Sequence, residues 1–105
     1  RGHLLHAGRV DAVAALTRLQ AAQEQHRSAH GLYAAQLGVL RGVGAVSPEG
    51  RYTVSMAPNG PDGYRATATA RAGGPQADDR ECSELTLDVV QGFSTPGPSA
   101  RCWRR

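Results

Sequence analysis

The sequence has 105 residues, a length typical of one domain with a modest core, and only 5% of them are aromatic. No run of 18 apolar residues is present, which excludes a predicted membrane span within this chain. The 12 basic residues are all arginine and outnumber 9 acidic ones, so the formal net charge is +3. That charge permits an anionic partner without requiring one.

Residues 1–31 predict one long helix that starts at or before Leu5 and ends at about His30. This stretch lacks proline and is rich in strong helix formers, and Gly31 can end it in the left-handed conformation. Such a helix is about 40 Å long, against a radius of gyration near 13 Å for a domain of about this size. We therefore expect its N-terminal end to project. One apolar stripe should face the core, formed by Leu5, Ala12, Leu16, Leu19, Gln23 and His26.

A second, smaller apolar strip runs along another side of this predicted helix. It consists of Val10, Val13, Ala14, Thr17 and Ala21. A helix lying on one small core needs only one apolar stripe. We therefore interpret Val10, Val13 and Thr17 as a face that packs against the helices of other subunits.

Strand periodicity replaces helical periodicity after a connecting segment, residues 32–50, whose Tyr33, Leu37 and Leu40 should pack against the sheet. Three segments alternate apolar and polar residues as strands do: 51–57, 64–70 and 85–90. The turn cluster "PNGPDG" should join the first two as a hairpin. We predict a single α+β domain over residues 1–105, with the long helix packed on a three- to four-stranded antiparallel sheet in residues 51–90.

The only two cysteines, Cys82 and Cys102, lie in the last quarter of the chain. A zinc site would need more ligands, and a redox dithiol would need closer spacing. The spacing favours a structural disulfide that closes a C-terminal loop over residues 82–102, which requires an oxidising compartment. Export is therefore expected although no secretory leader is visible, and we interpret the chain as a fragment that begins within a longer helix.

Two stretches resemble type IV pilins of the PilE kind. The first is "GRVDAVAALTRLQAAQEQHRSAHGLYA". The second combines "YRATATA", Gln76, Asp79 and Cys82 with "LTLDVVQG" and a terminal Cys-Trp pair. The resemblance implies the type IV pilin fold and a filament subunit, a minor pilin more than the major one.

The resemblance also implies partners and a location. The partners would be other pilin subunits, packed through their helices, and the pilus assembly machinery. The full-length form would be anchored by a hydrophobic segment upstream of Arg1, in the inner membrane and periplasm of a Gram-negative bacterium before assembly and in the extracellular pilus afterwards. The outcome would be pilus assembly and through it adhesion, twitching motility or DNA uptake. Two alternatives stay open: a DNA-binding receptor pilin of natural transformation, and a type II secretion pseudopilin, which the disulfide disfavours.

Two sets of side chains could bind a metal ion, and we interpret neither as a metal site. His26 and His30 are four residues apart on the predicted helix, but no third ligand accompanies them. An acidic cluster matches no calcium-loop spacing; it comprises Asp78, Asp79, Glu81 and Glu84. Asp79 is expected to accept backbone N–H bonds within its loop. No nucleophile or phosphate-loop motif is present, so we predict no enzyme and no cofactor.

The C-terminus carries the candidate nucleic-acid patch of this sequence. The patch consists of Arg101, Arg104 and Arg105, which flank Cys102 and Trp103, with Arg80 across the predicted disulfide. Arginines beside an aromatic ring can bind phosphates and stack on bases. We favour the alternative, a solvated tail with the tryptophan packed under the loop. In either case, the acidic cluster near Cys82 would cancel part of the positive field.

Overall fold

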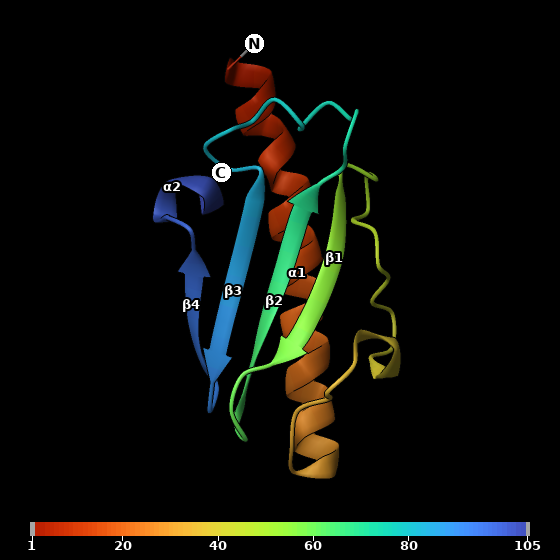
Figure 1. Ribbon diagram of the computed structural model, residues 1–105. Helices are drawn as coiled ribbons and strands as arrows, with labels where there is room; N and C mark the ends of the chain where they lie inside the picture. Colours follow the sequence, from red (N-terminus) through yellow and green to blue (C-terminus); the bar gives the residue numbers. More distant parts are fainter. Residues whose placement is uncertain (1, 105) are drawn as a thin grey trace.

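The computed structural model describes residues 2–104, in which one long helix lies across one face of a four-stranded antiparallel sheet (Figure 1). Each strand pairs with the next along the chain, in the order β1-β2-β3-β4. This arrangement confirms the predicted α+β class and the hairpin of the first two strands. The elements are α1 (Gly2–His30), η1 (Leu37–Val39), β1 (Tyr52–Pro58), β2 (Gly63–Ala70), β3 (Glu84–Val90), β4 (Phe93–Gly97) and α2 (Ala100–Trp103).

Helix α1 runs the length of the molecule. Its 29 residues correspond to about 43 Å at the usual helical rise, and the longest extent of the molecule is 44 Å. It ends as predicted, because Gly31 has a φ of +81° and its N–H donates to the Arg27 carbonyl at 2.7 Å. The expected projection is limited to the first turn, since the β2–β3 loop contacts the helix from Leu5 onward (Figure 1). No helix within residues 2–104 is long and apolar enough to cross a membrane.

The core lies between α1 and the inner face of the sheet. The predicted helix stripe is confirmed in its middle, where four residues are fully buried: Ala12, Leu16, Leu19 and Gln23. The sheet contributes alternate residues of its first three strands, namely Tyr52, Tyr64, Ala66, Ala68, Leu85 and Val89, each fully buried. The small alanine side chains at the centre of β2 let the helix lie close to the sheet.

Two buried polar side chains of α1 hold the connecting segment, residues 32–50, against the helix. The amide of Gln23 donates to the Ala34 carbonyl at 3.0 Å and accepts from the Ala34 N–H at 2.8 Å. The carboxylate of Asp11 accepts two backbone N–H bonds and a bond from the Ser47 hydroxyl. The buried Gln23 and Asp11 side chains thus find their hydrogen-bond partners within the fold. They also hold a connection whose only regular element is the one-turn helix η1.

The segment between the cysteines contains more than the predicted strand over residues 85–90. Besides β3 it includes β4 and the start of α2, and the sheet extends to Gly97 instead of ending at residue 90. Gln91 and Gly92 form a two-residue turn with φ values of 50° and 83°, the positive angles that tight hairpins require. β4 escaped prediction because it is a short edge strand that includes Pro96 and has no buried residue.

Candidate functional site

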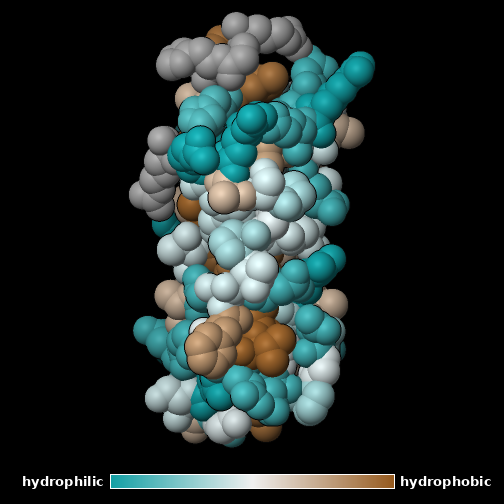
Figure 2. Space-filling view, turned by 90° about the vertical axis from the view of Figure 1, so that its left-hand side faces the viewer, coloured by the Kyte–Doolittle hydropathy of each residue, from teal (hydrophilic) through white to brown (hydrophobic). Residues whose placement is uncertain are grey.

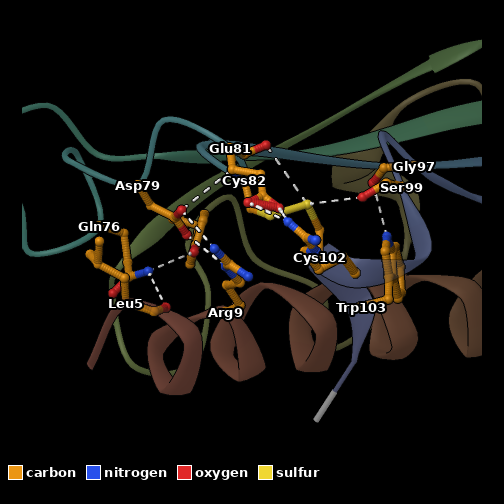
Figure 3. The surroundings of a disulfide bond; sticks show 12 residues. Leu5, Arg9, Gln76, Asp79, Glu81, Cys82, Gly97, Ser99, Cys102 and Trp103 are labelled. Atoms are coloured by element: carbon orange, nitrogen blue, oxygen red, sulfur yellow. Dashed lines mark hydrogen bonds and ion pairs between the residues drawn. A yellow bond between two sulfur atoms is a disulfide. The ribbon is translucent and has the colours of Figure 1, made fainter. Parts of the chain in front are cut away.

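The disulfide joins α2 to the segment that leads into β3, beside the N-terminal half of α1 (Figure 3). Cys82 and Cys102 are both fully buried, and their Cα atoms are 5.6 Å apart. This confirms the predicted pairing. In the chain-entropy picture, a crosslink that closes about twenty residues stabilises a fold by about 3 kcal/mol. The bond therefore fixes the C-terminal end of the chain on a rigid support.

Trp103 anchors α2 on the side away from the disulfide. Its indole N–H donates to the Gly97 carbonyl at 2.9 Å, and its half-buried ring packs against the core (Figure 3). This is the packed tryptophan that the sequence interpretation favoured. Since the ring is held by the protein and its polar edge is bonded, it is not a free stacking platform for a base.

The β2–β3 loop is fastened to α1 by a buried ion pair. Arg9 donates to both carboxylate oxygens of Asp79, at 2.8 and 2.9 Å, and both side chains are at least nine-tenths buried. The hydrogen bond to Asp79 raises the pKa of Arg9, so the guanidinium stays charged. Asp79 also accepts the Cys82 N–H at 3.4 Å, as predicted. The partner on the helix was not predicted, because the two residues are 70 positions apart.

Gln76 makes a second link between the same loop and the helix. Its amide donates to the Leu5 carbonyl at 2.9 Å and to the Tyr52 hydroxyl at 3.2 Å (Figure 3). The amide lies directly over Gly8, where any Cβ would overlap it. A glycine within the predicted helix, which costs about 1 kcal/mol relative to alanine, was the sequence signal that this contact exists.

The predicted arginine patch lies on the surface around the disulfide, and its members differ in whether they form ion pairs. Arg101 donates to Glu81 at 2.8 Å, across the disulfide, so one member is engaged by the acidic cluster. Arg80 and Arg104 are exposed and form no ion pair within residues 2–104. Arg105 lies outside the described residues. The described patch therefore presents two unpaired guanidinium groups and a third in an exposed pair.

A second group of unpaired basic residues lies along α1 and the connecting segment. Arg18 and Arg41 are exposed and form no ion pair among the described residues. Arg41 also lines a surface hollow of about 350 Å³ together with His26 and His30, and no acidic side chain lines it. The sequence interpretation did not single out these arginines, since they are far apart in the chain and follow no motif.

The two sets of side chains that were considered as metal ligands are not joined by further ligands among the described residues. The rings of His26 and His30 lie 4.4 Å apart, and His26 Nδ1 is 3.0 Å from the Leu32 carbonyl, to which it donates as the protonated nitrogen. Of the acidic cluster, Asp79 and Glu81 bind arginines. Within residues 2–104 the structure brings no three metal-ligating side chains together.

The proposed filament face of α1 is partly corrected by burial. Val10 is 41% exposed and Thr17 is exposed, as a packing face requires. Val13 is only 5% exposed and belongs to the core of the domain itself. The reason is that Val13 is one turn beyond the buried Arg9, on the side of the helix that the domain covers. The outer face therefore excludes Val13.

Comparison with known families gives a match over most of the chain. Residues 1–86 match a family model described as "Type IV minor pilin ComP, DNA uptake sequence receptor". The matched range covers α1, β1, β2 and the first three residues of β3, and it includes Arg80. It ends before β4 and α2. No curated protein matches the chain significantly.

Proposed function

The chain belongs to the type IV minor pilin family of that description, and we propose that it binds duplex DNA as a receptor subunit of a type IV pilus. The family match, which covers most of the chain, is the observation that carries this proposal. The architecture supports it, because the disulfide holds α2 and the exposed arginines on either side of the cysteines in one fixed surface of the domain.

The C-terminal patch is our first candidate for the DNA contact. Arg80 and Arg104 lie two residues before one cysteine and two after the other, so the disulfide ties them to the same rigid region. The pair between Arg101 and Glu81 is exposed on both sides, and an exposed pair contributes little. A DNA phosphate can therefore compete for Arg101. Two or three phosphate contacts would position the duplex without reading its sequence.

The second candidate for the DNA contact is the pair of exposed arginines Arg18, on α1, and Arg41, in the connecting segment. It is favoured by the absence of acidic side chains from the hollow that Arg41 and the two histidines line. Both arginines also lie within the residues that match the family model, whereas Arg101 and Arg104 lie beyond them. A receptor for one DNA sequence also needs contacts to base edges, and either patch could serve to position such contacts.

Fluorescence anisotropy with a labelled duplex at low salt tests the proposal. Three double variants remove two charges each: Arg80→Ala/Arg104→Ala, Arg18→Ala/Arg41→Ala, and a control, Arg65→Ala/Arg71→Ala. Arg65 is a suitable control because Asp88 binds it bidentately. We expect one of the first two variants to weaken binding at least tenfold, and the control to weaken it much less.

Each outcome of this experiment is informative. Loss in the first variant locates the contact at the C-terminal patch, and loss in the second locates it on α1. Equal weakening by all three variants would show a diffuse charge effect and no site. Absence of binding by the wild-type chain at low salt would contradict the proposed receptor function. Competition by unlabelled duplexes of different sequence then measures whether the chain reads bases.

We further propose that α1 contributes its outer face, including Val10 and Thr17, to packing against neighbouring pilins in the filament. The pilin family implies assembly in the periplasm and residence in an extracellular pilus. The finer proposals are an inner-membrane anchor upstream of Arg1, contacts with the assembly machinery, and a Gram-negative host. Detection of the full-length protein in pili sheared from cells, and its loss from cells lacking the assembly machinery, would test them.

A further inference from the structure

A hollow of about 350 Å³ lies between the last turns of α1 and the segment that follows η1, two elements that run side by side in Figure 1. Its apolar lining includes Val39 and Leu40, and its polar lining consists of Gln25, His26, His30 and Arg41. We call it the histidine hollow. Pockets for small ligands have volumes of about 300–1,000 Å³ and combine apolar walls with a few polar groups. The histidine hollow therefore has the size and the lining of a site for one small molecule.

Every ionisable side chain that lines the histidine hollow is basic. Arg41 is exposed and forms no ion pair among the described residues. Glu24 and Arg27, on the same turns of α1, both bind the Tyr33 hydroxyl and do not line the hollow. The other charged side chain of residues 32–50 is Glu49, which does not line it either. The hollow thus contains one permanent positive charge and two imidazoles, which gain charge as the pH falls.

The fold holds the ring of His26 in an orientation that suits an anion. Since a carbonyl oxygen only accepts, His26 Nδ1 donates to the Leu32 carbonyl at 3.0 Å, and protonation then adds an Nε2–H without breaking that bond. The centroid of the His30 ring lies 4.4 Å from that of His26. Two imidazolium groups at this separation repel each other, and an anion bound beside them relieves the repulsion. Anion binding should therefore be coupled to proton uptake.

A phosphomonoester attached to a flat apolar group matches this lining. Its charge at pH 7 is about −1.5 to −2, which suits a group of up to three positive side chains better than the single charge of a carboxylate does. Arginine binds phosphates through paired hydrogen bonds, and histidine rings stack on nucleobases. The ring of His30 and the side chain of Val39 are both exposed, so they offer surface to the flat group. A nucleotide combines these two parts in one molecule.

The other exposed apolar surface of the same end lacks the charges that a phosphate needs. Phe93 is 80% exposed and Val90 is 48% exposed, and they are cross-strand partners beside the β3–β4 turn. Figure 2 shows an apolar patch near the lower end of the β4 side. The Gln91 amide of this turn donates to the Asp62 carboxylate at 3.3 Å, so the neighbouring charge is negative. Charge therefore selects the histidine hollow for an anion.

We propose that the histidine hollow binds a nucleoside phosphomonoester, either a free nucleotide or the 5′-phosphorylated end of a DNA strand. A hollow of this size accommodates one nucleotide and not the side of a duplex. It therefore recognises a strand end, whereas the arginine pairs proposed for the DNA contact bind phosphodiesters along the duplex. The assignment to a DNA end rests on the proposed receptor function, and the binding of the nucleotide itself does not.

Amide NMR of the 15N-labelled chain, titrated with adenosine 5′-monophosphate at about pH 6.5, tests this site. Amides of residues 22–30 and 39–41 should shift along one saturating curve. Adenosine and inorganic phosphate should each bind about tenfold more weakly or worse, since each supplies only one of the two parts. Raising the pH to about 8 should weaken nucleotide binding at least about threefold, because imidazoles lose their charge over this range.

Matched variants separate the site from general charge. Arg41→Gln should weaken nucleotide binding about tenfold, and His26→Gln/His30→Gln should remove its pH dependence. His6→Gln removes an imidazole outside the hollow and should match the wild type. Three results would overturn the proposal: shifts spread over the whole surface, equal weakening by Arg41→Gln and Arg71→Gln, or no saturation by about 10 mM nucleotide.

Labelled duplexes with and without 5′-phosphates then identify the source of the nucleotide. Tighter binding of the phosphorylated duplex, with competition by the nucleotide, assigns the hollow to a DNA end. Equal binding of the two duplexes assigns it to a free nucleotide. Nucleotide binding by a chain that binds no duplex would contradict the receptor function alone, and duplex binding without nucleotide binding would overturn this inference alone.

Discussion

At the scale of single residues, the molecule is organised by a contact that only glycine permits. Gly8 lies in the second turn of α1, where the Gln76 amide reaches across it to the Leu5 carbonyl. The buried pair of Arg9 with Asp79 adjoins this contact and holds the same loop. These four residues place the β2–β3 loop, and with it Cys82 and the arginines around the disulfide.

Replacing Gly8 by alanine should destabilise the domain, although the same change in an ordinary helix stabilises it by about 1 kcal/mol. We expect a loss of about 1–3 kcal/mol, because the new methyl group must displace the Gln76 amide. Urea denaturation followed by circular dichroism measures this loss.

Two controls accompany the Gly8→Ala measurement. Ser28→Ala, on the exposed side of the same helix, should change the stability by less than about 0.5 kcal/mol. In a Gln76→Ala background, Gly8→Ala should cost much less, since the obstructing amide is absent. A stabilising effect of Gly8→Ala in the wild-type background would refute the contact.

At the scale of elements, the faces of α1 differ in burial. Its inner face forms the core with the sheet, and the residues of the outer face that include Val10 and Thr17 stay exposed. The buried position of Val13 shows that the domain itself covers one flank of the helix. Hence substitutions one turn apart on this helix should separate folding from assembly.

We predict opposite results for aspartate at two neighbouring valines of α1. Val10→Asp should leave the stability within about 1 kcal/mol but reduce incorporation of the full-length protein into pili, because it places a charge on the proposed packing face. Val13→Asp should cost about 3 kcal/mol or more by burying a carboxylate in the core. Urea denaturation of the domain and immunoblots of sheared pili measure the two effects. Equal destabilisation by both variants would show that Val10, like Val13, belongs to the core of the domain.

Sequence patterns predicted the elements whose burial is periodic. The stripe around Leu16 and the alternation in β1 to β3 were sufficient, because each follows from one-sided packing. They failed for β4, an edge strand in which no residue is buried. They also failed for the pair of Arg9 with Asp79, because a contact over 70 positions has no local signature. The arginines of the C-terminal patch were identified from the sequence by residue type, whereas Arg18 and Arg41 were not, and only the fold showed that Glu81 engages Arg101.

At the scale of the whole molecule, the core contains every tyrosine of the chain, and burial raises the pKa of all three above the ordinary value of about 10. The folded chain therefore retains protons that the unfolded chain releases. It follows that stability is full below about pH 10 and falls as the pH rises further. Tyr64 adds to this effect without a compensating bond, since its buried hydroxyl has no hydrogen-bond partner in the described structure.

An alkaline titration checks this behaviour. Tyrosinate absorbance should appear together with the loss of circular dichroism, because ionisation requires unfolding. Tyr64→Phe should be at least as stable as the wild type at neutral pH and lose less stability on alkalisation, since one unpartnered hydroxyl is removed. Tyrosinate formation by all three side chains in the intact fold would contradict the buried positions.

The charge of the whole molecule also bears on the proposed DNA binding. Its net charge is only +3, and acidic residues lie beside the disulfide, so binding should depend on a few guanidinium groups and not on a broad field. Such binding depends on salt in proportion to the number of phosphates contacted. A diffuse attraction would give no such link to individual arginines.

The salt dependence of duplex binding tests the receptor function most directly. Anisotropy titrations of the chain at several salt concentrations should give a log–log slope of about −2 to −3, as expected for two or three phosphate contacts. Removing the two arginines of the responsible patch should reduce the magnitude of the slope by about 2, whereas Arg65→Ala/Arg71→Ala should leave it nearly unchanged. A wild-type chain that shows no binding at low salt, or a slope that neither pair of patch arginines affects, would contradict the account.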